Sequence, residues 1–306
     1  MRALLFPGQG SQYVGMALDF YKKFDSVKKN FETVDKTLGY SLSKIILEGP
    51  DSELKLTQNT QPAIMTVGVS IFNVLKEKNK LNLENIKFFA GHSLGEYTAL
   101  VCAGSLTLER AAYLLKERGV AMQNAVSPSR GAMLAILGMT LNEVEKEIDE
   151  LPKKEICEIA NDNSNTQVVV SGEKEVIKIL NENLKKKKKR GIMLPVSAPF
   201  HCSLMKDAAN NMKKKIEDTV FLKPEPGIIS NVTAKQETDI DRIKPLLIDQ
   251  ITSRVRWRES VNYMIKEGVK EFLEIGPGKV LSGLVKKIHD KTNISNISSL
   301  DDIKND

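Results

Sequence analysis

The sequence predicts an α/β fold in which a large domain with a parallel β-sheet carries a small inserted subdomain of the ferredoxin-like, βαββαβ type. Two patterns predict it. Short buried strands alternate with longer helices at both ends of the chain, and between about residues 130 and 195 the order becomes strand, helix, strand, strand, helix, strand. A chain of 306 residues is long enough for two compact units. We expect the large domain at 1–128 and 198–306, and the subdomain at 129–197.

The individual elements follow from the period of the apolar residues. Before the insertion we expect strands at 3–6 and 86–90, and helices from about 15 and at 63–78, 96–103 and 107–125. Inside it we expect strands at 132–137, 156–160, 167–171 and 192–196, and helices at 141–150 and 173–185. After it we expect strands at 227–232 and 271–275, and helices at 203–218, 243–252, 257–267 and from 279. The last residues, 301–306, have the composition of a polar tail.

Composition excludes a membrane protein. Apolar residues make up 41% of the chain and charged residues 27%, as in ordinary globular proteins. The longest apolar stretch, 62–72, is interrupted by polar residues and is shorter than the ~18 residues that a membrane span needs. The N-terminal apolar stretch ends at Pro7, which is too early for a signal peptide. We therefore expect a cytoplasmic protein.

The cysteines predict neither a disulfide framework nor a metal centre. Cys102, Cys157 and Cys202 are far apart in the sequence and lack the paired spacing of zinc ligands. We expect reduced thiols and no bound metal.

The formal net charge of +6 arises from 45 basic and 39 acidic residues. Six consecutive cations contribute to it, namely Lys185, Lys186, Lys187, Lys188, Lys189 and Arg190. Such a run is typical of a solvated helix end, and it is also suited to attract an acidic partner, either nucleic acid or protein.

Ser93 is the candidate nucleophile. It is the serine of a G-x-S-x-G segment at 91–95, which lies between an expected strand and an expected helix. The two glycines lack a Cβ atom, so the chain can turn sharply and expose the Ser93 hydroxyl at the positive end of the following helix. The position within the fold favours catalysis over a purely structural turn.

A nucleophilic serine needs a general base, and the sequence offers only three histidines. His92 adjoins Ser93, where neighbouring side chains diverge. His289 lies among lysines on an expected exposed helix end. His201 follows an expected strand and precedes an expected helix, so it is the candidate base.

Arg118 indicates a substrate with a carboxylate. The residues at offsets of 3, 4 and 7 from Arg118 on the expected helix 107–125 are all apolar, so the guanidinium lies in the buried stripe. It remains charged there and needs an anionic partner, and its planar fork suits a carboxylate. That carboxylate belongs either to the substrate or to an internal salt bridge.

Other glycine-rich segments are weaker signals. The turn at 6–12 does not match G-x-G-x-x-G and lacks a Walker lysine, so no nucleotide phosphate loop is predicted. Its backbone amides could face an oxyanion. The segment 276–279 is typical of a turn into a helix.

Taken together, these residues resemble the malonyl-CoA:acyl carrier protein transacylase family of type II fatty acid synthesis. The resemblance covers nearly the whole chain. It depends on the segments 6–12, 60–63, 91–96, 118–119, 122–123, 161–163, 195–201 and 276–281, and on Gln250 with Trp257. It implies an α/β-hydrolase-like large domain with the ferredoxin-like subdomain inserted.

The resemblance also implies a role for each matching residue. Ser93 would be acylated and His201 would act as base and acid. The amides of Gln9 and Leu94 would form the oxyanion hole, and the main-chain carbonyl of Gln250 would orient the histidine. Arg118 would bind the malonyl carboxylate, and Gln61, Met122, Asn161 and Asn163 would lie at the substrate.

The resemblance implies a ping-pong transfer of malonyl from malonyl-CoA to acyl carrier protein, with no cofactor besides the coenzyme A thioester. We expect a monomer that binds neither nucleic acid nor membrane, and we expect the cations at 185–190 to attract the acidic carrier. Three alternatives stay open. They are a trans-acting acyltransferase of a polyketide pathway, a serine hydrolase and a carrier-binding scaffold without activity.

Overall fold

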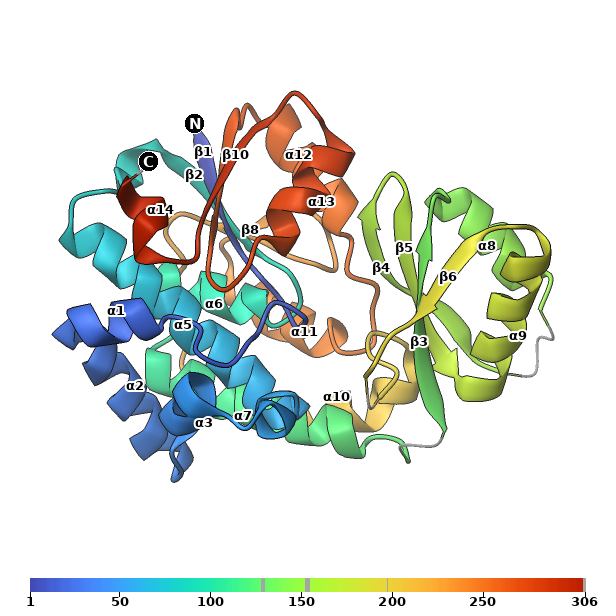
Figure 1. Cartoon of the computed structure of the whole chain (residues 1–306), viewed down its shortest axis with the longest axis horizontal. Coiled ribbons are helices and arrows are strands. Elements are labelled where there is room, and N and C mark those ends of the chain that lie inside the picture. The colour runs from blue at the N-terminus through green and yellow to red at the C-terminus, as the bar shows by residue number, and fades with distance from the viewer. Residues whose placement is uncertain (128–129, 152–154, 197, 305–306) are drawn as a thin grey trace.

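A computed structural model describes residues 1–127, 130–151, 155–196 and 198–304 (Figure 1). The large sheet has the strand order β10-β9-β1-β2-β7-β8. Its strands are β1 (Arg2–Phe6), β2 (Ile86–Gly91), β7 (Ile228–Ile229), β8 (Gln236–Glu237), β9 (Glu271–Ile275) and β10 (Asn293–Ile297). Neighbouring strands are parallel except at the β7–β8 edge. The expected parallel sheet is confirmed.

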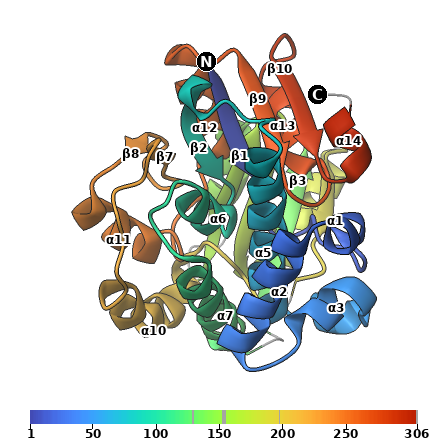
Figure 2. The ribbon, with the colours of Figure 1, turned by 90° about the vertical axis from the view of Figure 1, so that its left-hand side faces the viewer.

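The side chains of β1 alternate between the two faces of this sheet. Leu4 and Phe6 belong to the core on one face, beneath the helices α2 (Asp25–Leu38), α5 (Thr57–Glu77), α6 (Gly95–Cys102) and α7 (Leu108–Asn124). Ala3 and Leu5 belong to the core on the other face, beneath α12 (Trp257–Lys266) and α13 (Val280–Ile288). Figure 2 shows α2, α5 and α7 packed side by side. Helices thus cover both faces, as the apolar run at 3–6 in β1 requires.

The small sheet is antiparallel and has the order β4-β5-β3-β6. Its elements are β3 (Gly131–Leu137), α8 (Leu141–Asp149), β4 (Cys157–Ser164), β5 (Gln167–Glu173), α9 (Lys174–Lys186) and β6 (Arg190–Met193). This order of elements confirms the expected βαββαβ arrangement. Leu134 and Ile136 of β3 face the core beneath α8 and α9, whereas Met133 and Ala135 face the large domain. One face of the sheet is therefore available to form a site.

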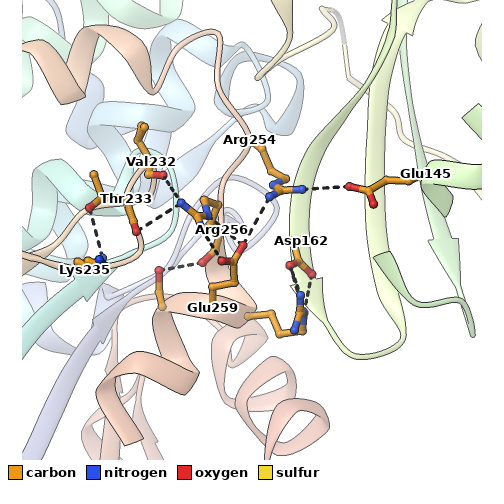
Figure 3. Close-up of polar contacts among 10 residues, drawn as sticks. Glu145, Asp162, Val232, Thr233, Lys235, Arg254, Arg256 and Glu259 are labelled. Atoms are coloured by element: carbon orange, nitrogen blue, oxygen red, sulfur yellow. Dashed lines mark hydrogen bonds and ion pairs between the residues drawn. The ribbon is translucent and has the colours of Figure 1, made fainter. Parts of the chain in front are cut away.

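Polar contacts join β4 and α8 of the small sheet's layer to residues 254–258 of the large domain (Figure 3). The amide of Asp162 donates to the carbonyl of Val255 at 3.0 Å, and the Val255 amide donates to the carbonyl of Ala160 at 2.8 Å. The fully buried Asp162 carboxylate accepts from Arg258 at 2.8 Å, and Arg254 pairs with Glu145 at 3.5 Å. Strand β4 is thereby held against the segment that follows Gln250.

Several boundaries differ from the expected ones. The first helix does not begin near 15, because Gly15 has a left-handed φ of 88°, and α1 spans Leu18–Lys23. Strand β6 spans Arg190–Met193 instead of 192–196; beyond its end, Leu194 donates one more hydrogen bond to Met133 of β3, and Leu194 and Val196 line a cavity. The interpretation of 301–306 as a polar tail is wrong over the described part, which forms α14 (Leu300–Lys304), and 305–306 lie outside the described residues.

The remaining helices are α3 (Leu42–Glu48), α4 (Asp51–Leu54), α10 (Lys206–Glu217) and α11 (Ile240–Asp249), with 3₁₀ turns at Leu83–Asn85 and Ser203–Met205. In the described part of the chain, no helix has both the length and the apolar character to cross a membrane. All three cysteines are free.

Candidate active site

Ser93 lies in the turn between β2 and α6, at the carboxyl end of the parallel sheet. Its φ is 54°, a left-handed value that costs a non-glycine residue about 1 to 3 kcal/mol. Neither flanking glycine tolerates a side chain. A Cβ atom on Gly91 would lie 1.9 Å from the backbone of Gly95, and one on Gly95 would lie 2.2 Å from the carbonyl oxygen of Phe6. The two glycines are thus required by the close approach of three backbone segments.

Asn231, which follows β7, fixes this turn from the side. Its Oδ1 accepts from the Ser93 amide at 2.7 Å, and its Nδ2 donates to the carbonyl of Gly91 at 2.7 Å. The strained conformation of Ser93 is therefore held by a side chain far away in the sequence.

His201 contacts the Ser93 hydroxyl. The distance from Ser93 Oγ to His201 Nε2 is 2.8 Å, and that from His201 Nδ1 to the main-chain oxygen of Gln250 is 2.8 Å. A carbonyl oxygen only accepts, so Nδ1 carries the proton and Nε2 is free to accept one from Ser93. The carbonyl occupies the place that a carboxylate takes in a Ser-His-Asp triad.

The surroundings of His201 disfavour its charged form. Burial is the larger cause, and the positive charge of Arg118 adds to it, and together they lower the pKa of His201 to about 3. The imidazole is therefore neutral at physiological pH, as a general base must be.

Arg118 lies in the same site although it is only 1% exposed. Its Nη1 donates to Gln61 Oε1 at 2.7 Å, and its Nη2 donates to Gln250 Oε1 at 2.8 Å and to Ser93 Oγ at 3.2 Å. All three acceptors are neutral. Among the described residues no carboxylate forms an ion pair with Arg118, and its Nε has no hydrogen-bond partner. The internal salt bridge, one of the two alternatives drawn from the sequence, does not form.

A buried carboxylate lies behind this arginine. Glu96 of α6 is 1% exposed, and its Oε2 accepts from Gln250 Nε2 at 2.7 Å and from the Asn231 amide at 3.1 Å. Burial raises the pKa of Glu96 to about 7. Gln250 thus contacts His201, Arg118 and Glu96 at once.

The expected oxyanion donors lie beside Ser93. Gln9 is held there because Gly8 lies so close to the carbonyl of His92 that a Cβ atom would approach it to 2.6 Å. Within the described residues, the amides of Gln9 and Leu94 donate no hydrogen bond. Two unpaired N–H groups beside a nucleophile are suited to bind a developing oxyanion.

The residues predicted from the sequence meet at a cavity of about 110 Å³ between the two sheets. Of those residues, all except Asn163 and Gln250 line it, namely Gln9, Gln61, Ser93, Leu94, Arg118, Met122, Asn161 and His201. Asn163 lies behind the wall, where its Oδ1 is 2.9 Å from His92 Nε2. Gln250 does not line the cavity but contacts two residues that do, His201 and Arg118.

Sequence reasoning missed part of this cavity. Four apolar side chains also line it: Met133 of β3, and Leu194, Val196 and Phe200 of the segment that leads from β6 back to the large domain. His92, set aside as a base, also lines the cavity, and its ring packs on Trp257 with centroids 5.6 Å apart. The wall that the subdomain contributes is thus largely apolar.

The described residues include no group of three or more histidine, cysteine, aspartate or glutamate side chains placed to hold a metal ion.

Comparisons with known proteins agree with this geometry. The family model described as "Acyl transferase domain" matches residues 3–306. The malonyl CoA-acyl carrier protein transacylase of Bacillus subtilis is 43% identical over 289 residues, which cover 94% of this chain and 90% of that protein. That of Escherichia coli is 40% identical, with coverages of 96% and 94%.

Solved structures agree as well. The acyl-carrier-protein-S-malonyltransferase of Bartonella henselae superposes with a TM-score of 0.96 at 42% identity, covering 99% of this chain and 97% of that one. A malonyl-transacylase solved in complex with its type II PKS acyl-carrier protein superposes with a TM-score of 0.95 at 37% identity, with coverages of 99% and 97%. A family match over almost the whole chain, joined to a serine and histidine in contact, shows that this chain belongs to the acyl transferase family.

Proposed function

We propose that this protein transfers the malonyl group of malonyl-CoA to the phosphopantetheine thiol of an acyl carrier protein, and so supplies extender units for fatty acid synthesis. One observation carries the choice of acyl group. The charged, buried Arg118 has only neutral acceptors around it and lies 3.2 Å from the Ser93 hydroxyl. The nearby Glu96 accepts no hydrogen bond from it, so an acyl group with a terminal carboxylate supplies the anionic hydrogen-bond partner that the guanidinium lacks. The names of the relatives support the same substrate and carrier.

The proposed reaction begins with attack by Ser93. Its proton passes to His201 Nε2 while Oγ bonds to the thioester carbon, and the amides of Gln9 and Leu94 bind the resulting oxyanion. The intermediate collapses, the carbon–sulfur bond breaks, and the His201 imidazolium returns the proton to the coenzyme A sulfur. The malonyl ester on Ser93 remains, with its carboxylate on Arg118.

The second half repeats these steps with the carrier thiol. His201 takes the thiol proton, the sulfur attacks the ester, and the proton returns to Ser93 as the ester bond breaks. This reaction uses the side chains and main-chain groups named here and the thioester, and it calls for neither a metal nor a redox cofactor. All groups come from one chain, so a monomer suffices, and we place the reaction in the cytoplasm.

Intact-mass analysis tests the proposal. The protein is mixed separately with malonyl-CoA, acetyl-CoA and methylmalonyl-CoA, and carrier proteins from fatty acid and polyketide systems are then added. We expect a malonyl adduct that persists until a carrier is added and then transfers to it. Rapid loss of the adduct to water would indicate a hydrolase, absence of an adduct would indicate a scaffold, and transfer to the polyketide carrier alone would indicate the polyketide enzyme.

Arg118 is expected to hold the pKa of His201 down. In an Arg118→Gln variant the charge is gone while burial remains, so we expect the His201 pKa to rise from about 3 towards its usual value. Titration of the His201 imidazole by NMR measures this pKa. His92→Gln is the comparison variant: His92 lowers the His201 pKa less than Arg118 does, so its removal should raise that pKa by a smaller amount. An unchanged His201 pKa in Arg118→Gln would show that the guanidinium charge does not lower the pKa of the base.

The run of cations at 185–190 is proposed to attract the acidic carrier. Its side chains are exposed, but Lys187 is paired with Glu147 and Glu150 at 2.8 and 2.9 Å. The run spans the end of α9, the following turn and the first residue of β6, which leads to the cavity-lining Leu194. Long-range attraction raises association rates and weakens with salt.

Neutralising Lys185, Lys186 and Lys189 to glutamine should lower the second-order rate with carrier protein at low salt by about threefold or more. The matched control changes the exposed Lys22 and Lys23 of α1 and Lys29 of α2 to glutamine, and these two helices lie at the opposite end of the molecule from α9 (Figure 1). Stopped-flow measurement at several salt concentrations distinguishes the two. Equal second-order rates with carrier protein for the two triple variants at low salt would contradict the proposal that the cations at 185–190 attract the carrier.

A further inference from the structure

Gln250 contacts both the general base and the carboxylate-binding arginine. Its main-chain oxygen contacts His201 Nδ1, and its side-chain Oε1 contacts Arg118 Nη2, both at 2.8 Å. The residue that orients the base therefore also holds the carboxylate-binding guanidinium. A side-chain amide has two chemically different ends, and only the oxygen end can accept from an arginine.

Glu96 determines which end faces Arg118. The amide nitrogen of Gln250 donates to Glu96 Oε2 at 2.7 Å and to the main-chain oxygen of Ser93 at 3.1 Å. If the amide rotated by half a turn, its oxygen would face the Glu96 carboxylate and its NH₂ group would face the guanidinium, so acceptor would meet acceptor and donor would meet donor. Both groups are fully buried, so no water relieves that conflict.

Glu96 is itself held in place by the nucleophile turn. The Asn231 amide donates to the same Oε2 atom at 3.1 Å, and the Asn231 side chain bonds Ser93 N and Gly91 O. Glu96 thus accepts hydrogen bonds from both Asn231 and Gln250, the residues that hold the catalytic groups in place. It does not itself line the cavity.

We infer that Glu96 is a positioning residue for acyl-group selection: by accepting from Gln250 Nε2, it holds the Gln250 amide oxygen on Arg118 and so keeps the guanidinium aimed at the substrate carboxylate. The inference rests on the proposed function, since it assigns how that site distinguishes carboxylated from uncharged acyl groups.

Two substitutions separate acceptance of a hydrogen bond from other roles. Glu96→Gln keeps one oxygen that can accept from both donors, removes the charge and replaces the other oxygen with an NH₂ group. Glu96→Met keeps a similar volume and removes the acceptor. We expect Glu96→Met to lower the ratio of kcat/KM for malonyl-CoA to that for acetyl-CoA at least tenfold, and Glu96→Gln to restore the ratio to within about threefold of the unmodified protein.

The ratio is the informative quantity because both rates are measured on one preparation, so partial unfolding cancels. The control is Glu274→Met. Glu274 of β9 is equally buried, but its carboxylate binds Leu281 N and Ser282 outside the cavity. We expect that variant to lose stability without a change in the ratio.

An unchanged ratio in Glu96→Met, or an equal loss in Glu96→Gln, would overturn the inference. If the unmodified protein itself failed to prefer malonyl-CoA, the proposed function would fail instead, and the two failures are therefore distinct.

Discussion

Ser93→Ala should abolish the malonyl adduct and nearly all transfer to carrier protein. The Ser93 hydroxyl is 2.8 Å from its base, and no other hydroxyl or thiol occupies that position among the described residues of the cavity. Loss of the nucleophile in a serine–histidine enzyme lowers turnover by about 10⁶-fold. The measurement is intact mass after incubation with malonyl-CoA, together with the rate of carrier acylation.

The control is Ser105→Ala. Ser105 is also buried, and its hydroxyl has no hydrogen-bond partner within the described residues. That variant should acquire the adduct at the unmodified rate. An adduct that persisted in Ser93→Ala, mapped by peptide analysis to another side chain, would displace Ser93 from the proposed role.

The architecture could be predicted from local patterns. Uninterrupted apolar strands such as β1 require cover on both faces, and the change of rhythm after residue 130 marked the small sheet. Some errors lie where local chemistry overrides the pattern, as at Gly15 with its left-handed φ and at Leu194, which belongs to the cavity and not to β6. Other elements were not predicted, among them α2 and the edge strand β10. The domain limits at 128 and 197 stay predictions, because they fall on residues outside the described ranges.

Part of the site followed from single residues. Ser93 was indicated by its motif, and Arg118 by a charge among apolar neighbours. The same pattern marks Glu96, whose C-terminal neighbours at offsets of 3, 4 and 7 are the apolar Ala99, Leu100 and Ala103. Asn231 gave no such signal, because it follows a two-residue strand and meets Ser93 only in the folded chain.

Arg118→Ala should lower kcat/KM for malonyl-CoA by about two to four orders of magnitude, since the substrate carboxylate would be buried without its partner, at a cost of about 3 to 5 kcal/mol. The rate with acetyl-CoA should be kept or rise, because the guanidinium no longer binds the Ser93 hydroxyl or lowers the His201 pKa, so the preference shifts towards uncharged acyl groups. Acyl-enzyme formation with each thioester measures the shift. Comparable acylation by acetyl-CoA in the unmodified protein would contradict the role assigned to Arg118.

The contacts of Arg118 also predict how acetyl-CoA is rejected. Without a carboxylate, Nη2 remains hydrogen-bonded to Ser93 Oγ, and the guanidinium charge holds the pKa of His201 low. Formate can supply the anion that the acetyl group lacks, neutralise that charge and draw the guanidinium from the serine. We therefore expect formate to accelerate acetylation of Ser93 by acetyl-CoA, with no acceleration in Arg118→Ala or in chloride of equal ionic strength. If formate only inhibited, the carboxylate would contribute affinity alone, and selection would not act through the nucleophile and its base.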